Sequence, residues 1–404
     1  MNMENKLVPL CRFPDYTHDD GEWNEQKVEE IINTITPPKK LQSNEYKKNG
    51  KYPIIDQSQE FICGYSDDDS AVINKNANEL VVFGDHTCVL KFIDFPFIQG
   101  ADGIKIFKSK EPNKINVRYL YQYLASSPIE SKEYKRHFSE LKEKRFQYPE
   151  TTDEQCKIAD CLFAFDSYIS SNNEIVKQLK AIKEGLMQKL FPGKGKKTPK
   201  LRFKEFENDG EWGEKKLGDL FDRVTKRNKK NNKNVLTISA QYGLVSQYDY
   251  FNKNVAALDV TNYYLINKGD FAYNKSRSQG YPYGAIKSLR LYDEGVVSTL
   301  YICFKIKKDI NCNTEFFEQY FETDLINCEI GKIAQEGARN HGLLNISTDD
   351  FFNKVSIIVP SPSEQKKIAD CLSSIDKMIS FHVKKSNLLE QHKKGLMQQL
   401  FPKQ

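Results

Sequence analysis

An internal repeat constrains the fold of this chain more than any other feature of its sequence. Residues 154–192 align without a gap with residues 364–402, and about half of the aligned positions are identical. A shorter repeat precedes each of these segments, because RF and GEW recur at 12–23 and 202–212. The chain therefore passes twice through one order of segments. Such a duplication predicts two halves related by a pseudo-two-fold axis.

Each copy of the longer repeat has the pattern of a long helix. Its apolar residues alternate in steps of four and three, which is the heptad spacing of a coiled coil. Capping-box patterns at Thr151 with Glu154, and at Ser361 with Glu364, predict where the two helices begin. The predicted seam residues are Ile158, Leu162, Phe165, Ile169, Val176, Leu179, Leu186 and Leu190 in the first helix and Ile368, Leu372, Ile375, Ile379, Leu389, Leu396 and Leu400 in the second.

Polar residues interrupt both predicted seams at matching places. Asn172 and His382 fill one gap, and Lys183 and Lys393 fill another. Polar residues in a seam cost stability but can specify the register and the number of partner helices. We interpret the two segments as an antiparallel helix pair within the chain. The alternative is that each helix packs on its own globular domain.

The two blocks between the repeats hardly resemble each other, although both have the patterns of mixed α/β domains. The predicted elements are strands at 80–93, 101–108, 235–243, 295–306 and 354–360 and helices at 117–126 and 314–326. Divergent blocks on a retained helical scaffold are expected when the blocks carry specificity. The predicted fold class is therefore α+β, with two α/β domains and two long antiparallel coiled-coil helices.

The repeat also predicts the domain limits. We expect a first α/β domain at 1–150, a central helix at 151–192, a basic linker at 193–204, a second α/β domain at 205–360 and a C-terminal helix at 361–404.

Composition narrows the class of protein. With 39% hydrophobic and 28% charged residues in 404, the chain is expected to be globular and to form two or three domains. Nine scattered cysteines without CxxC spacing indicate the reduced thiols of a cytoplasmic protein and offer no metal ligand set. No run reaches the length of a membrane span, so we expect no membrane association.

At this point the sequence resembles a known family, the specificity subunits of Type I restriction-modification systems. The resemblance rests on both EQ-KIA-CL helices, the two LFP endings, the RF and GEW openings and the two dissimilar blocks. Segments 273–289 and 337–347 are also similar to target-recognition domains of that family.

The resemblance implies a division of labour among subunits. Each block would be a target-recognition domain that reads one half of a split double-stranded DNA target. The paired helices would act as a ruler and as a docking surface for two methyltransferase subunits, which restriction and translocase subunits then join. Methylation and cleavage would take place in those partners. S-adenosylmethionine would bind to the methyltransferase, and no cofactor is expected in this chain.

DNA recognition requires cations for the phosphates and forked or amide side chains for the base edges. Two loops, one basic stretch and one polar turn offer such side chains. The alternative for each is a solvated loop or helix face, and the same alternative holds for the basic clusters at 194–202 and 223–233. The predicted DNA-binding residues are Tyr273, Asn274, Lys275, Ser276, Arg277, Ser278, Gln279 and Tyr281, then Arg339, Asn340 and His341, then Lys135, Arg136 and His137, and finally Asp85, His86 and Lys91.

Two other classes of function compete with this interpretation. An enzyme is disfavoured because the one Pro-Pro pair, Pro37-Pro38, has the wrong neighbours for an adenine methyltransferase. Asp15 with Glu25 and Lys27 fits a magnesium-dependent nuclease only loosely, and the second copy lacks the pattern. We therefore predict no catalytic residue and no metal ligand. A structural adaptor whose blocks bind proteins is the third class, and a preference for one bipartite DNA sequence would exclude it.

Overall fold

The computed structural model describes residues 7–17, 22–101, 103–131, 135–239, 243–248, 259–336 and 342–402. Its contacts define two compact units. The first comprises Met1–Glu174 with Val383–Gln404, and the second comprises Ile175–His382. Each unit therefore contains one of the dissimilar blocks and parts of both long helices.

The first unit is built on an antiparallel sheet of four strands in the order β2-β10-β7-β8. Its strands are β2 (Ile32–Ile35), β10 (Ile104–Ser109), β7 (Leu80–Gly84) and β8 (Leu90–Ile93). Strand β7 is apolar and buried along its whole length, because it lies between two neighbours and beneath a helix. The predicted strand at 80–93 is thus a hairpin, β7 and β8, and the strand predicted at 101–108 corresponds to β10.

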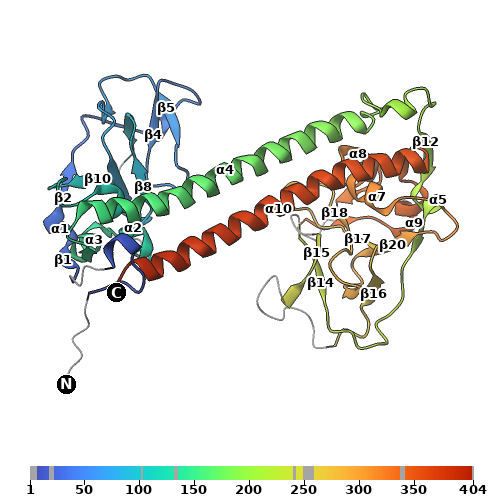
Figure 1. Cartoon of the computed structure of the whole chain (residues 1–404). Helices are drawn as coiled ribbons and strands as arrows, with labels where there is room; N and C mark the ends of the chain where they lie inside the picture. The colour runs from blue at the N-terminus through green and yellow to red at the C-terminus, as the bar shows by residue number, and fades with distance from the viewer. Residues whose placement is uncertain are drawn as a thin grey trace. The chain divides into compact units, whose positions relative to one another are not determined.

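Helix α2 (Val117–Ser126) lies beside β7 and β8 in this unit (Figure 1). Its bounds are those predicted from the sequence. Asn116 is the N-cap residue of this helix, and its side chain accepts a hydrogen bond from the Tyr119 backbone N–H at 2.9 Å. The short helices α1 (Val28–Ile31) and α3 (Phe138–Glu143) contact each other.

Further strands complete the first unit. Strand β1 pairs with β11, and a second sheet, of five short strands, has the order β3-β9-β4-β5, with β6 also paired to β9. The bounds are β1 (Asn24–Lys27), β11 (Arg145–Tyr148), β3 (Lys40–Leu41), β9 (Phe97–Gly100), β4 (Tyr52–Ile55), β5 (Gly64–Ser66) and β6 (Val72–Ile73).

The second unit repeats the central sheet of the first, with the order β13-β20-β17-β18. As α1 contacts α3 in the first unit, α5 contacts α9 in the second. In both units the helix that follows the first strand of the unit contacts the helix that precedes its last strand. The bounds are β13 (Phe221–Arg223), β20 (Ile302–Ile306), β17 (Phe271–Asn274), β18 (Ala285–Ser288), β12 (Gly213–Lys216), β23 (Ser356–Val359), α5 (Leu217–Leu220) and α9 (Thr348–Asn353). The two dissimilar blocks therefore share the strand order of their central sheets, which their sequences do not reveal.

The remaining strands of the second unit form pairs, β14 with β15, β16 with β19 and β21 with β22. Their bounds are β14 (Leu236–Ser239), β15 (Gly243–Ser246), β16 (Tyr264–Asn267), β19 (Glu294–Val297), β21 (Gln335–Glu336) and β22 (Leu344–Asn345). The strand predicted at 295–306 is two strands, β19 and β20, in different sheets.

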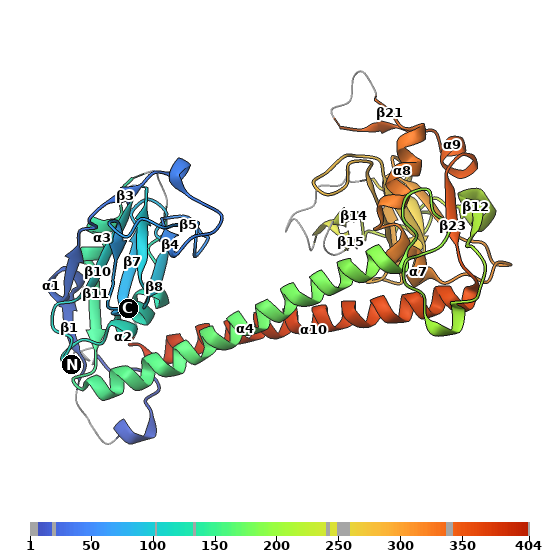
Figure 2. The same cartoon turned by 90° about the horizontal axis from the view of Figure 1, so that it is seen from above.

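The single helix predicted at 314–326 is wrong. The segment forms two helices, α7 (Thr314–Tyr320) and α8 (Asp324–Ile333). The Thr323 hydroxyl donates a hydrogen bond to the Tyr320 carbonyl at 2.6 Å. That bond satisfies a carbonyl at the end of α7, so the chain can turn before α8 begins. Figure 2 shows α8 and α9 in the same unit as α7.

The two predicted long helices are confirmed as α4 (Thr152–Leu190) and α10 (Pro362–Leu400), each of 39 residues. They pack together in antiparallel orientation, because residue numbers rise along α4 where they fall along α10. In the first unit Asp166 contacts Lys393, and in the second Lys183 contacts Asp376. The fold class is thus confirmed as α+β with two α/β regions and a pair of long antiparallel helices.

The predicted seam residues serve two purposes. Ile158 and Leu162 are buried in the core of the first unit, and Ile368 and Leu372 in that of the second. The helix ends therefore pack on globular blocks, as the alternative interpretation held, while the middle parts pack on each other. Of the other predicted seam residues, Val176, Leu190 and Leu400 are buried. The half-buried ones are Phe165, Ile169, Leu179, Leu186, Ile375, Ile379, Leu389 and Leu396.

Candidate nucleic-acid interface

The sequence-predicted loops occupy equivalent places in the two units. The turn between β7 and β8 contains Asp85 and His86, and the turn between β17 and β18 contains residues 275–284. Both turns join the third and fourth strands of the central sheet. Candidate residues from two blocks without sequence similarity therefore lie on equivalent hairpins of the two units.

In the second unit the hairpin turn is closed by its own backbone hydrogen bonds. Ser278 and Tyr281 exchange two backbone hydrogen bonds, at 3.2 and 2.9 Å, which close the tip around Gly280. Gly280 has a φ of +81°, and Gly284 has the same value. A Cβ at Gly284 would lie 2.2 Å from the Asn274 carbonyl oxygen, so this turn requires glycine there.

A second loop lies against this turn. The Arg277 N–H donates to the Gly342 carbonyl at 2.8 Å, and the Leu344 N–H donates to the Lys275 carbonyl at 3.0 Å. The hairpin turn is therefore joined by backbone bonds to the segment from Gly342 to Leu344, which leads through β22 toward α9. The predicted residues Arg339, Asn340 and His341 precede Gly342 in the sequence and lie outside the described residues.

The first unit repeats this arrangement with different residues. The His137 N–H donates to the Asp85 carbonyl at 2.7 Å, and the His86 Nδ1 lies 3.1 Å from the Lys135 carbonyl oxygen. The loop that contains Lys135 and Arg136 precedes α3, as the loop around Gly342 precedes α9. In each unit one hairpin turn and one pre-helix loop thus form a single surface.

The structure divides the predicted residues by exposure. Those exposed on the turns and loops are Arg277, Ser278, Gln279, Lys135 and Arg136, and those half-buried are Asn274, Lys275, Ser276, Tyr281 and His86. Burial lowers the pKa of Lys275. The exposed group combines cations with hydroxyl and amide side chains, which is the chemistry that contacts phosphates and base edges.

Four predicted residues are buried, and this corrects their assignment as DNA contacts. Asp85, Lys91, His137 and Tyr273 are each at most 3% exposed. Asp85 accepts a hydrogen bond from the Phe138 N–H at 2.9 Å, and Tyr273 donates to the Tyr283 carbonyl at 2.7 Å. Their bonds are satisfied within the unit, so they support the surface and do not form it.

Some residues of the basic clusters and of the loose nuclease pattern are engaged by other side chains. Arg202, counted in a basic cluster, is buried against Glu364 at 2.7 Å. Asp15 pairs with Lys157, and Glu25 accepts a hydrogen bond from Gln147 at 2.9 Å. In the described part of the chain, no three His, Cys, Asp or Glu side chains are grouped to hold a metal ion.

The sequence pointed to the turns but missed residues that hold them. Lys287 and Glu322 bind the second turn through Tyr281, and Gln57 binds the first. A usable signal was present, since Lys91 and Lys287 each follow or precede apolar residues in a short strand segment, LKFI and AIKS. A lysine in such a strand is costly to bury unless it has a partner.

None of the described helices combines the length and the apolarity that a membrane span requires.

Comparison with known proteins identifies a family that matches the chain. Residues 20–181 and 209–391 match the family described as the Type I restriction modification DNA specificity domain. The matched family concerns DNA specificity, not catalysis. The two matched segments each contain one dissimilar block and most of one long helix.

Two individual proteins are similar to the chain. A segment of 102 residues is 26% identical to the Type I restriction enzyme EcoR124I/EcoR124II specificity subunit of Escherichia coli; it spans only 25% of that relative's length and 25% of this chain. The crystal structure of a Type I restriction-modification S subunit from M. genitalium covers 98% of this chain and 100% of its own, with a TM-score of 0.62 and 14% identity. That likeness shows a common fold. Because the family matches most of the sequence in two segments that follow the internal repeat, the chain belongs to the Type I restriction-modification DNA specificity family.

Proposed function

We propose that this chain reads a split DNA target as the specificity subunit of a Type I restriction-modification complex. The first unit would read one half-site and the second unit the other. The observation that carries the proposal is the equivalent surface in each unit, made of one hairpin turn and one pre-helix loop. Equivalent surfaces with different side chains are expected when two readers share a scaffold and recognise different bases.

The exposed side chains supply both kinds of contact that such a reader needs. Arg277 and Gln279 carry the forked and amide groups that bond base edges in the major groove. Lys135 and Arg136 carry charges suited to phosphates or to guanine in the first unit. We assign the half-buried His86 and Tyr281 to the rim of the two surfaces, and Arg339, Asn340 and His341 remain candidates for the second.

The long helices would set the distance between half-sites. A helix of 39 residues is about 58 Å long at about 1.5 Å per residue. That length exceeds one turn of duplex DNA, about 34 Å, so a spacer of unread base pairs between the half-sites is expected.

The helices also offer a surface for partner subunits. Tyr168, Ile175 and Ile182 recur every seventh residue of α4, so they share one face, and all three are exposed. Helix α10 exposes Met378, Phe381 and Leu388. Exposed apolar stripes on a soluble protein indicate protein interfaces. We propose that two methyltransferase subunits, which would hold S-adenosylmethionine, dock here, and that restriction subunits join that assembly.

DNA selection from a randomised duplex pool tests this proposal. The chain would be presented with its methyltransferase partner at near-physiological salt, because protein–DNA affinity depends steeply on salt. A split motif with a gap of constant length is the expected result. A continuous motif would leave one unit silent, and no motif at all would favour an adaptor. Turnover by the chain alone would favour an enzyme.

A further inference from the structure

Two lysines occupy the same place in the two central sheets. Lys91 on β8 stands opposite Val82, and Lys287 on β18 stands opposite Ala272, in the equivalent edge strand next to the hairpin turn. Lys91 is 3% exposed and the Lys287 side chain 12%. Neither can reach DNA from that position.

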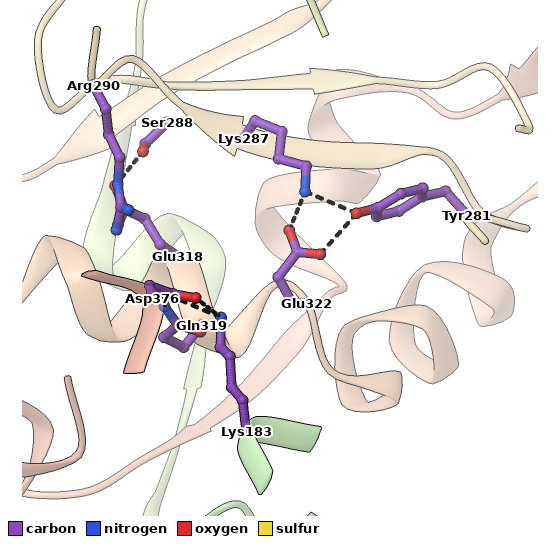
Figure 3. A network of polar contacts seen from close by, with 9 residues as sticks. All are labelled: Lys183, Tyr281, Lys287, Ser288, Arg290, Glu318, Gln319, Glu322 and Asp376. Atoms are coloured by element: carbon purple, nitrogen blue, oxygen red, sulfur yellow. Dashed lines mark hydrogen bonds and ion pairs between the residues drawn. The ribbon is translucent and has the colours of Figure 1, made fainter. Parts of the chain in front are cut away.

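Lys287 ties down the tip of its own hairpin. Its Nζ donates to the Tyr281 hydroxyl at 2.8 Å and to the Glu322 carboxylate at 2.5 Å. The Tyr281 hydroxyl in turn donates to the other Glu322 oxygen at 2.8 Å (Figure 3). Tyr281 is the residue that closes the turn with Ser278, so this triad fixes the turn that carries Arg277.

The triad is anchored on the helical side of the unit. Glu322 follows α7, whose Glu318 bonds Ser288, the last residue of the strand that carries Lys287, and pairs with Arg290 just beyond that strand. The next residue, Gln319, donates to Asp376 of α10 at 2.9 Å (Figure 3). Helix α7 and Glu322, which follows it, therefore contact both the turn and the long helix α10.

Lys91 ties down the turn of the first unit through a different loop. Its Nζ donates to the backbone carbonyls of Asp56 and Glu60, at 2.8 and 2.6 Å. Between these residues lies Gln57, whose carbonyl accepts a 2.6 Å bond from the Thr87 hydroxyl. The lysine thus fixes the loop that in turn fixes the hairpin tip.

We propose that Lys91 and Lys287 are positioning residues for sequence recognition, each holding one hairpin turn in the geometry that reads its half-site. The inference rests on the proposed function of the two turns. Burial opposes the charged form of a lysine, and an apolar side chain at either position would pack without that cost. The lysine ammonium group donates hydrogen bonds to the turn or to the loop that supports it, and a methionine side chain does not. A base contact depends on such support, because its geometry tolerates little displacement.

The test replaces each lysine in the full chain bound to its methyltransferase partner. Lys287→Met should relax the bases of one half-site, and Lys91→Met those of the other, each by about tenfold or more in discrimination, the worth of one well-placed base contact. Lys287→Arg, which keeps a donor, should recover part of the loss. Lys268→Met and Lys51→Met are matched controls, because these exposed lysines pair with Asp293 and Asp69 away from the turns and should leave the motif unchanged.

A second readout does not involve DNA. Amide hydrogen exchange of the isolated complex should rise across 275–283 in Lys287→Met and across 84–89 in Lys91→Met. Tyr281→Phe and Thr87→Val remove the ties and leave both lysines in place, so they should raise the same exchange even where a lysine variant fails to fold.

The outcomes separate the inference from the function it rests on. The wild-type complex could select a split motif while the lysine variants keep both that motif and the exchange protection. That result would contradict the positioning role and leave the proposed function intact. Loss of affinity that is equal for all sequences would also contradict the positioning role, since that is the effect of a general loss of structure or of phosphate contact. If the wild-type complex selects no split motif, both the proposed function and the inference that rests on it are contradicted.

Discussion

The repeated arginine of the RF motif and the repeated glutamate of the helix motif meet in each unit. Arg12 contacts Glu154 through two hydrogen bonds of 2.8 and 2.7 Å, and Arg202 contacts Glu364 at the same two distances. The capping hydroxyls of Thr151 and Ser361 bond the helix N–H groups as predicted, at 3.4 Å. The glutamate side chains, however, bind arginine in place of completing the capping box. These residues recur because they join the start of each repeat to its helix.

Removal of the Arg202 guanidinium should strongly destabilise the second unit. The side chains of Arg202 and Glu364 are 7% and 1% exposed, so Arg202→Ala leaves a buried carboxylate without its partner. The expected loss is about 3–5 kcal/mol in the free energy of unfolding, measured by chemical denaturation. The double variant Arg202→Met with Glu364→Leu should lose less, because no unpaired charge remains. An equal or larger loss in the double variant would contradict this argument.

Arg277 should carry specificity for one half-site. If its guanidinium bonds a base edge with two hydrogen bonds, Arg277→Ala costs about 1–3 kcal/mol in binding and relaxes that half-site alone. Selection of binding sites by the variant complex measures both effects. The same loss is expected for Arg339→Ala. A loss that is uniform over all sequences would reassign the residue to phosphate contact.

The long helices are joined by polar contacts between residues at equivalent positions of the internal repeat. Lys183 pairs with Asp376, and Lys393 pairs with Asp166, at 2.7 and 2.6 Å. Gln319 and Gln122, on α7 and α2, bond the same two aspartates. Asn172 adds a buried 2.7 Å bond to the Ser386 hydroxyl. Directional contacts of this kind specify the register of a helix pair, which apolar side chains alone leave less defined.

The two lysine–aspartate pairs should show coupling in double-mutant cycles. We expect about 0.5–1.5 kcal/mol for Lys183 with Asp376, since both side chains are partly shielded from water and share a further hydrogen bond. Stability of the single and double alanine variants gives the coupling. Lys366 with Asp370 on α10 is the matched control, because solvent screens this exposed pair and it should couple less strongly. Equal coupling in both pairs would remove the special role of the Lys183 contact.

At the scale of the whole molecule, each compact unit is completed by residues from distant parts of the chain. The core of the first unit includes Leu400 and Phe401, and Phe401 packs on Tyr119 and Tyr123 with ring centroids 5.7 and 5.3 Å apart. The core of the second unit includes Leu190 and Phe191. The repeated LFP therefore seats the end of each long helix in a globular block, and neither block is complete without both helices.

A change in helix length should alter the target in a defined way. Four residues inserted into either long helix, near the unit boundary at Glu174 or Val383, should change the preferred spacer and leave both half-sites intact. Four residues add about 6 Å of helix, enough to shift the spacing by a base pair or two. Selection from the randomised pool measures the spacer. An unchanged spacer would contradict the proposed ruler.

Much of the architecture could be predicted from the sequence because it depends on local signals. The heptad spacing, the capping residues and the gap-free repeat located α4 and α10, and the residue pattern at 117–126 located α2. Local signals failed at 314–326, where one hydrogen bond from Thr323 ends a helix that the apolar pattern would continue.

What the sequence determined by itself was the duplication, the two long helices and the turns with recognition chemistry, since periodicity and turn residues act over a few positions. Only the tertiary structure decided that the two dissimilar blocks share one sheet order and that their candidate turns are equivalent. It alone separated exposed Arg277 from buried Lys91 and His137. Burial depends on which distant segments pack together. A lysine that reads as a DNA contact along the chain can therefore become, in the folded unit, the support beneath the residues that face solvent.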